Sequence, residues 1–99
     1  MRQFDLYPNP SIASRSFAPF VLVLQSHYLA LDTTVVVPLA SDKLASNLEV
    51  EVEVQGQRLI VAITEISSVR TVSLRSVIAN LVAHEDAIRR AFERLLSGF

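Results

Sequence analysis

Apolar and polar residues alternate most regularly at 49–54, where three valines at even positions alternate with three glutamates at odd positions. This period of two predicts a strand with one buried face and one charged face. Gln55-Gly56 predicts a tight turn, and 58–63 predicts the returning strand of a hairpin. If the loop has two residues, Glu53 lies opposite Arg58, so we expect an ion pair between these side chains.

Shorter apolar runs predict further strands. They are 3–7 with apolar residues at 4 and 6, the continuous run 20–24, the β-branched run 35–39, and 69–74. The run at 20–24 indicates a strand that is covered on both faces or lies at an interface. Pro38 confines its end of the strand to an edge, a bulge or a terminus, because proline donates no ladder hydrogen bond. Between these strands, 11–16 predicts a polar loop, 28–31 a short apolar segment and 41–46 a helical turn, while 76–81 is ambiguous.

The C-terminal part of the chain changes to a helical period. Apolar pairs at 87/88, 91/92 and 95/96 alternate with charged pairs at 85/86, 89/90 and 93/94. This predicts an amphipathic helix that begins near Ala83 without a good N-cap and ends at Ser97-Gly98. The apolar stripe expected to anchor it consists of Ile88, Ala91, Phe92 and Leu95. Phe99 follows the helix and either packs back onto the domain or belongs to a contact surface.

Together these elements predict one domain over 1–99 that is mainly β (α+β), an antiparallel sheet with a single C-terminal helix. The apolar fraction of 51% and mean hydropathy of +0.38 are high for 99 residues, so we expect part of this surface to be buried in a homodimer. No apolar run approaches the ~18 residues of a membrane span. The first residues do not resemble a signal peptide, and the chain has no cysteine, so we expect a cytoplasmic protein without membrane contact.

Residues that could carry catalysis or bind a cofactor are sparse. His84-Glu85 resembles the start of a zinc-binding helix, but Ile88 stands where the second ligand would be. The only glycines are at 56 and 98, too few for a phosphate-binding loop, and the net charge is −1. We therefore expect no catalytic residues, no metal and no cofactor, although sequence alone leaves a serine nucleophile open.

Four blocks, in this order, resemble the CcdB toxins. They are Gln3-Phe4-x-Leu6-Tyr7, 20–26, 36–41 and Thr64-x-x-x-Ser68-Val69. The resemblance implies a small SH3-like β-barrel with a C-terminal helix, which dimerises through its sheet. It implies a toxin whose helix tips enter the dimerisation domain of DNA gyrase A and trap the cleavage complex. A partly disordered antitoxin would wrap the dimer, and the two together would repress their own operon, with operator DNA contacted only through the antitoxin.

By position, the resemblance implies a gyrase-binding surface on the helix tip and on the segment after Gln25-Ser26. Its residues are Leu96, Ser97, Gly98 and Phe99, Glu93 one turn earlier, and Tyr28 and Leu29. The best-known toxin of the family carries tryptophan at the position of Ser97, and serine cannot stack on target arginines as an indole does. Two alternatives remain: an endoribonuclease toxin of the MazF and Kid type, which shares the barrel, and a non-poisoning co-repressor that binds only the antitoxin.

Overall fold

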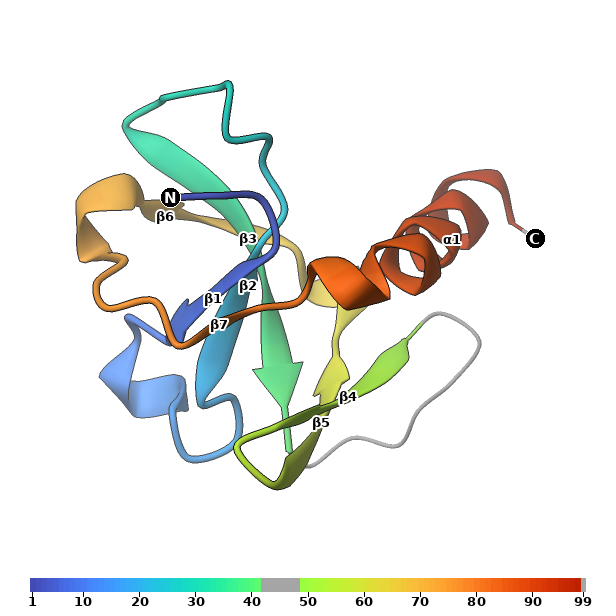
Figure 1. The fold of residues 1–99 in the computed structure, drawn as a ribbon, viewed down its shortest axis with the longest axis horizontal. Coiled ribbons are helices and arrows are strands. Elements are labelled where there is room, and N and C mark those ends of the chain that lie inside the picture. The colour runs from blue at the N-terminus through green and yellow to red at the C-terminus, as the bar shows by residue number, and fades with distance from the viewer. Residues whose placement is uncertain (42–48, 99) are drawn as a thin grey trace.

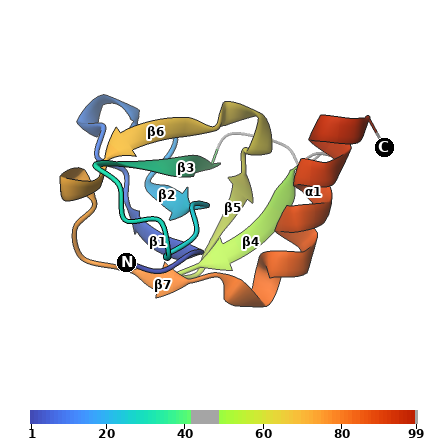
Figure 2. The same cartoon turned by 90° about the horizontal axis from the view of Figure 1, so that it is seen from above.

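A curved antiparallel sheet and one helix make up this computed structural model, which describes residues 1–41 and 49–98 (Figure 1). The strands are β1 Asp5–Pro8, β2 Phe20–Val23, β3 Thr33–Ala40, β4 Val50–Val54, β5 Gln57–Val61, β6 Ser67–Arg70 and β7 Ala79–Asn80. Their order is β4-β5-β3-β2-β1-β7, and β6 pairs with β3 beside β5. Helix α1 spans Glu85–Ser97 and lies across the open end of the curved sheet (Figure 2). The predicted small barrel with a C-terminal helix is confirmed.

Strand β3 is the interior strand around which the sheet is organised. One side pairs with β2; the other pairs first with β6, as far as Val36 opposite Ser67, and then with β5 from Leu39 opposite Val61. Pro38 lies at this change of partner, and its carbonyl accepts a hydrogen bond from the Ala62 N–H at 3.0 Å. Of the three predicted settings, the edge is wrong: Pro38 lies in an interior strand, near its C-terminal end. An interior strand tolerates the proline because a donor is not needed where one partner strand ends and the next begins.

The main core lies between the inner face of the sheet and α1. Its fully buried side chains include Leu6, Leu22, Leu39, Leu59, Ile63 and Ile88. A smaller cluster on the opposite face of the sheet contains Tyr7, Val21, Val23 and Val36. Strand β2 contributes alternate residues to both clusters, which confirms that the run at 20–24 is covered on both faces.

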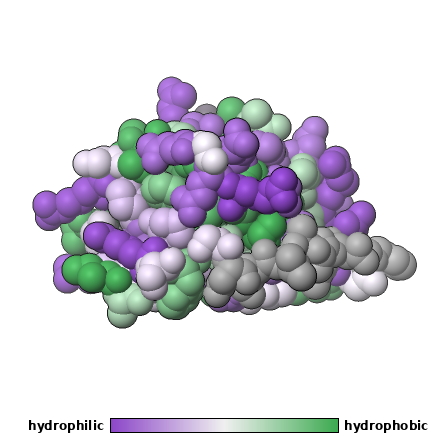
Figure 3. Space-filling view, turned by 90° about the horizontal axis from the view of Figure 1, so that it is seen from below, coloured by the Kyte–Doolittle hydropathy of each residue, from purple (hydrophilic) through white to green (hydrophobic). Residues whose placement is uncertain are grey.

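The β4–β5 hairpin has the predicted register, with Glu53 opposite Arg58. Gln55 (φ 52°) and Gly56 (φ 77°) are both left-handed, as a two-residue type I′ turn requires. The expected ion-pair partner is wrong, because Arg58 Nε lies 3.3 Å from Glu51 Oε1. A long arginine reaches this diagonal neighbour because the strands of a hairpin are twisted. Polar residues cover much of the face that carries the hairpin (Figure 3).

Several boundaries differ from the sequence prediction. Strand β1 begins at Asp5, because Phe4 adopts a left-handed φ of 69° and cannot continue an extended strand. The predicted strand 69–74 is β6 followed by a 3₁₀ turn at Thr71–Ser73, and the predicted loop at 11–16 contains a 3₁₀ turn at Ile12–Ser14. The helical turn expected at 41–46 lies, apart from its first residue, outside the described residues. Within the described ranges, no helix has the length and apolar character needed to cross a membrane.

Candidate functional site

The C-terminal half of α1 projects beyond the sheet that anchors its first half (Figure 2). A 3₁₀ turn at Val82–His84 leads into the helix, and no side chain caps its N-terminus, as the sequence predicted. Ile88 and Ala91 are buried and Phe92 is partly buried, but Leu95 is 37% exposed. The anchoring stripe is thus shorter than predicted, and the last turn of α1 makes little contact with the core.

The side chain of Leu96, at the described tip of α1, lies mostly in solvent. Leu96 is 84% exposed. The Ser97 hydroxyl donates to the Glu93 carbonyl at 2.6 Å, which ties it to its own helix. Gly98 ends the helix in the left-handed conformation (φ 82°), and its N–H donates to the Arg94 carbonyl at 2.8 Å. The expected helix stop is confirmed, whereas Phe99 lies outside the described residues.

The β2–β3 loop exposes the other predicted contact residues. Tyr28 is 86% exposed, and Leu29 and Leu31 are also exposed. The loop is ordered by local bonds: the Gln25 side-chain amide donates to the Leu29 carbonyl at 2.8 Å, and its oxygen accepts from the Val35 N–H at 3.2 Å. An apolar segment held in solvent by its own hydrogen bonds is a candidate contact surface.

An apolar groove of about 390 Å³ separates α1 from the base of this loop. Its lining includes Leu24, Val35, Ile66, Phe92, Glu93 and Leu96. Two of the predicted site residues, Glu93 and Leu96, therefore share one groove. Tyr28 and Leu29 are not part of its lining, although their loop begins beside its opposite wall at Leu24.

The groove also contains residues that the sequence did not assign to a site. Phe92 was predicted only as part of the helix anchor, and no pattern in the sequence placed the isolated Ile66 beside the helix. Arg89 lines the groove as well; its Nε lies 2.7 Å from Glu85 Oε2, an ion pair across one helical turn. Its guanidinium carbon also lies 5.9 Å from the centre of the Phe4 ring. The ion pair lies within α1, and the cation–π contact with Phe4 joins the middle of the helix to the N-terminal segment.

The exposed apolar side chains of this surface make it a candidate binding site. Among residues 1–41 and 49–98, no group of three His, Asp or Glu side chains is placed to hold a metal ion. The pKa of Tyr7, which lies outside this surface, is raised by burial and, secondarily, by the charge of Asp5. An exposed apolar tip, an exposed apolar loop and the groove between them offer contact area for another macromolecule.

Comparison with known proteins identifies the family. The sequence pattern of the CcdB protein family matches residues 3–98. The chain belongs to the CcdB family. No curated protein matches it by sequence. Membership in this family makes the chain a toxin of a toxin–antitoxin system and implies an antitoxin partner and a toxin that forms dimers.

A solved structure supports the fold. The Mycobacterium tuberculosis toxin MazF-mt6 superposes with a TM-score of 0.65 at 19% sequence identity, over 90% of this chain and 96% of that chain. At this identity the likeness concerns the fold alone, a barrel that both chains share. Function has to be argued from the surface of this CcdB-family chain.

Proposed function

We propose that this CcdB-family toxin binds DNA gyrase A through the tip of α1 and traps the gyrase cleavage complex. The observation that carries the proposal is the exposure of Leu96 at the end of a helix that projects beyond its own domain. Such a projecting apolar tip contributes little to folding and is available to enter a concave target. The toxin acts by binding alone, without a chemical step of its own.

The apolar anchors on this surface account for the expected strength of binding. Because Ser97 cannot stack and its hydroxyl is bonded within the helix, we place the main contact on Leu96 and on the loop residues Tyr28 and Leu29. A well-packed anchor of this kind is worth roughly 2 kcal/mol or more at an interface. The exposed aromatic ring of Tyr28 is available for the stacking that position 97 does not supply.

We infer that the toxin dimerises through β6. This strand pairs only with β3 among the described residues, so its other edge is open to a second copy. Ile66, immediately before β6, is 43% exposed and lines the apolar groove. A second chain placed along β6 would cover an edge and an apolar side chain that are costly to leave in water.

We further propose that a partly disordered cognate antitoxin covers this toxin and that the complex represses its own operon. With a net charge of −1, the toxin has no overall positive charge to attract DNA. Operator contacts are therefore assigned to the antitoxin, and the toxin acts in the cytoplasm on gyrase.

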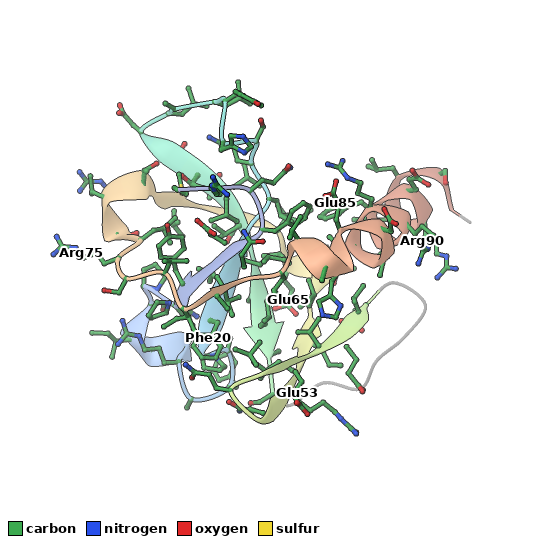
Figure 4. The ribbon with its side chains drawn as sticks, in the orientation of Figure 1. Phe20, Glu53, Glu65, Arg75, Glu85 and Arg90 are labelled. Atoms are coloured by element: carbon green, nitrogen blue, oxygen red, sulfur yellow. The ribbon has the colours of Figure 1, made fainter. Side chains whose placement is uncertain are left out.

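The test compares the wild type, a truncation that ends at Leu95 and so removes Leu96, and Ser97→Trp in gyrase supercoiling and trapped-cleavage assays. The truncation should keep its fold and abolish gyrase inhibition, and Ser97→Trp should strengthen inhibition of a susceptible gyrase. Arg75→Ala, at the opposite end of the domain from α1 (Figure 4), is the matched control. Trapping by the truncation at wild-type level would show that the helix tip is not the inhibitory element. Repression together with the antitoxin but no trapping by any variant would identify a co-repressor instead.

The absence of an enzymatic step is tested separately with purified toxin and single-stranded RNA. We expect no sequence-specific cleavage. Specific cleavage that disappears when one arginine or one acidic residue is replaced would establish the endoribonuclease alternative.

A further inference from the structure

A second hollow, of about 410 Å³, lies between the N-terminal segment, the β2–β3 loop and the start of α1. It shares Gln3 and Phe4 with the apolar groove, but most of its other lining residues are polar. Its other lining residues are Arg2, His27, Asn80, Val82 and Glu85. Neither the proposed gyrase contact nor the inferred dimer edge uses this polar pocket.

Most polar groups of the pocket already have partners. The Gln3 amide donates to the Leu24 carbonyl at 2.8 Å, and the Asn80 amide donates to Asp5 Oδ1 at 3.0 Å and to the Gln3 carbonyl at 3.2 Å. Glu85 accepts from Arg89 at 2.7 Å, so its negative charge is largely offset. These bonds fix the walls of the pocket without filling it.

Two donor groups remain without a hydrogen bond or ion pair to the described residues, the Arg2 guanidinium and the His27 imidazole. Both line the same hollow. Glu85, at the start of α1, also lines this hollow (Figure 4). A guanidinium and an imidazole that face one pocket are suited to a phosphate group, because both donate to its oxygens.

An aromatic surface adjoins these donors. The His27 and Tyr28 rings lie 4.3 Å apart between centroids, and Tyr28 is almost fully exposed. Exposed aromatic rings bind the flat faces of nucleobases, with little dependence on which base is present. A carboxylate or an inorganic anion would satisfy the donors but would leave this ring uncovered.

We propose that the pocket binds a nucleotide, with its phosphate held by Arg2 and His27 and its base stacked on Tyr28. The pocket volume is within the usual range for a small-molecule site. The occupant is a single nucleotide or one unit of a single strand, since a base paired within a duplex has no free face for the ring. Arg2 and His27 lie outside the proposed gyrase surface, but Tyr28 belongs to both, so nucleotide and gyrase would compete for its ring.

The test is calorimetric titration of the full chain with GMP, guanosine and inorganic phosphate as separate probes. GMP should bind saturably, and guanosine and phosphate should each bind at least about tenfold more weakly, because each lacks half of the contacts. Arg2→Gln and His27→Ala should each weaken GMP binding on the order of tenfold, as expected for the loss of one charge-assisted hydrogen bond. Arg75→Gln, far from the pocket, is the matched control and should bind as the wild type does.

Three results would overturn the proposal: no saturable binding of GMP at millimolar concentration, unchanged affinity in both pocket variants, or equal loss in the Arg75→Gln control. If phosphate alone binds as tightly as GMP, the pocket is an anion site and the assignment of a nucleotide is wrong. Circular dichroism of each variant confirms that a loss of binding does not reflect a loss of fold.

Discussion

Alanine at Ile88 and alanine at Leu96 should have opposite effects on stability and on gyrase inhibition, although both positions lie on α1. Ile88 is 1% exposed and belongs to the main core. Removing three carbon atoms there leaves a cavity, and such substitutions cost about 2–5 kcal/mol. Leu96 buries almost nothing within its own chain, so its truncation should change stability by no more than about 0.5 kcal/mol.

The two substitutions should differ clearly in melting temperature and in inhibition of supercoiling. A loss of about 3 kcal/mol at Ile88 should lower the melting temperature by roughly 12–24 °C for a domain of this size. Leu96→Ala should melt as the wild type does and yet inhibit supercoiling at least about tenfold less well, because an interface anchor is worth roughly 2 kcal/mol. Urea denaturation followed by circular dichroism at two protein concentrations gives the stability, and supercoiling inhibition gives the function.

The expectations for Ile88→Ala and Leu96→Ala can each be contradicted by experiment. A cost below about 1 kcal/mol for Ile88→Ala would mean that the core does not anchor α1 at this residue. A cost above about 1 kcal/mol for Leu96→Ala, with a midpoint that depends on protein concentration, would mean that Leu96 packs against a second copy of the chain. Leu96 would then belong to the dimer interface and not to the gyrase contact.

Three further outcomes are expected. Light scattering at micromolar concentration should give about twice the chain mass of 11.0 kDa, and a monomer would contradict the inferred β6 interface. Gly56→Ala should lower the free energy of unfolding in urea by about 1 kcal/mol, because φ is +77° at this residue. No atom lies within 4 Å of an added Cβ, so the cost comes from the backbone alone, and a neutral result would contradict the type I′ turn. Burial, with the Asp5 charge, raises the pKa of Tyr7 above its ordinary value. The contribution of Tyr7 to stability is therefore complete below pH 10 and is lost as the pH rises through the folded-state pKa. Tyr7→Phe should therefore lose less stability than the wild type as the pH rises above 10, and parallel losses would contradict this.

Local pattern was sufficient for the elements whose neighbours in sequence are also their neighbours in space. The valine–glutamate alternation and Gln55-Gly56 determined the hairpin and its register, because a two-residue turn leaves one pairing available. The helical period determined α1, and Gly98 determined where it ends, since left-handed backbone favours glycine. Leu96 was assigned to the contact surface of the tip by the resemblance to the CcdB toxins and not by this period.

The position of Pro38 and the two concave surfaces depend on long-range packing and could not be predicted from local sequence patterns. Pro38 lies in an interior strand only because β6 and β5 meet beside it, and that junction involves residues far apart in sequence. The apolar groove exists because α1 crosses the sheet next to Ile66, and the polar pocket exists because the N-terminal segment, His27 and Glu85 converge. The sequence by itself therefore determined the hairpin, the helix and the helix stop, which depend on short-range backbone geometry and period. The concave surfaces were decided by tertiary structure alone, because side-chain proximity across the fold depends on how the sheet curves and where the helix is anchored.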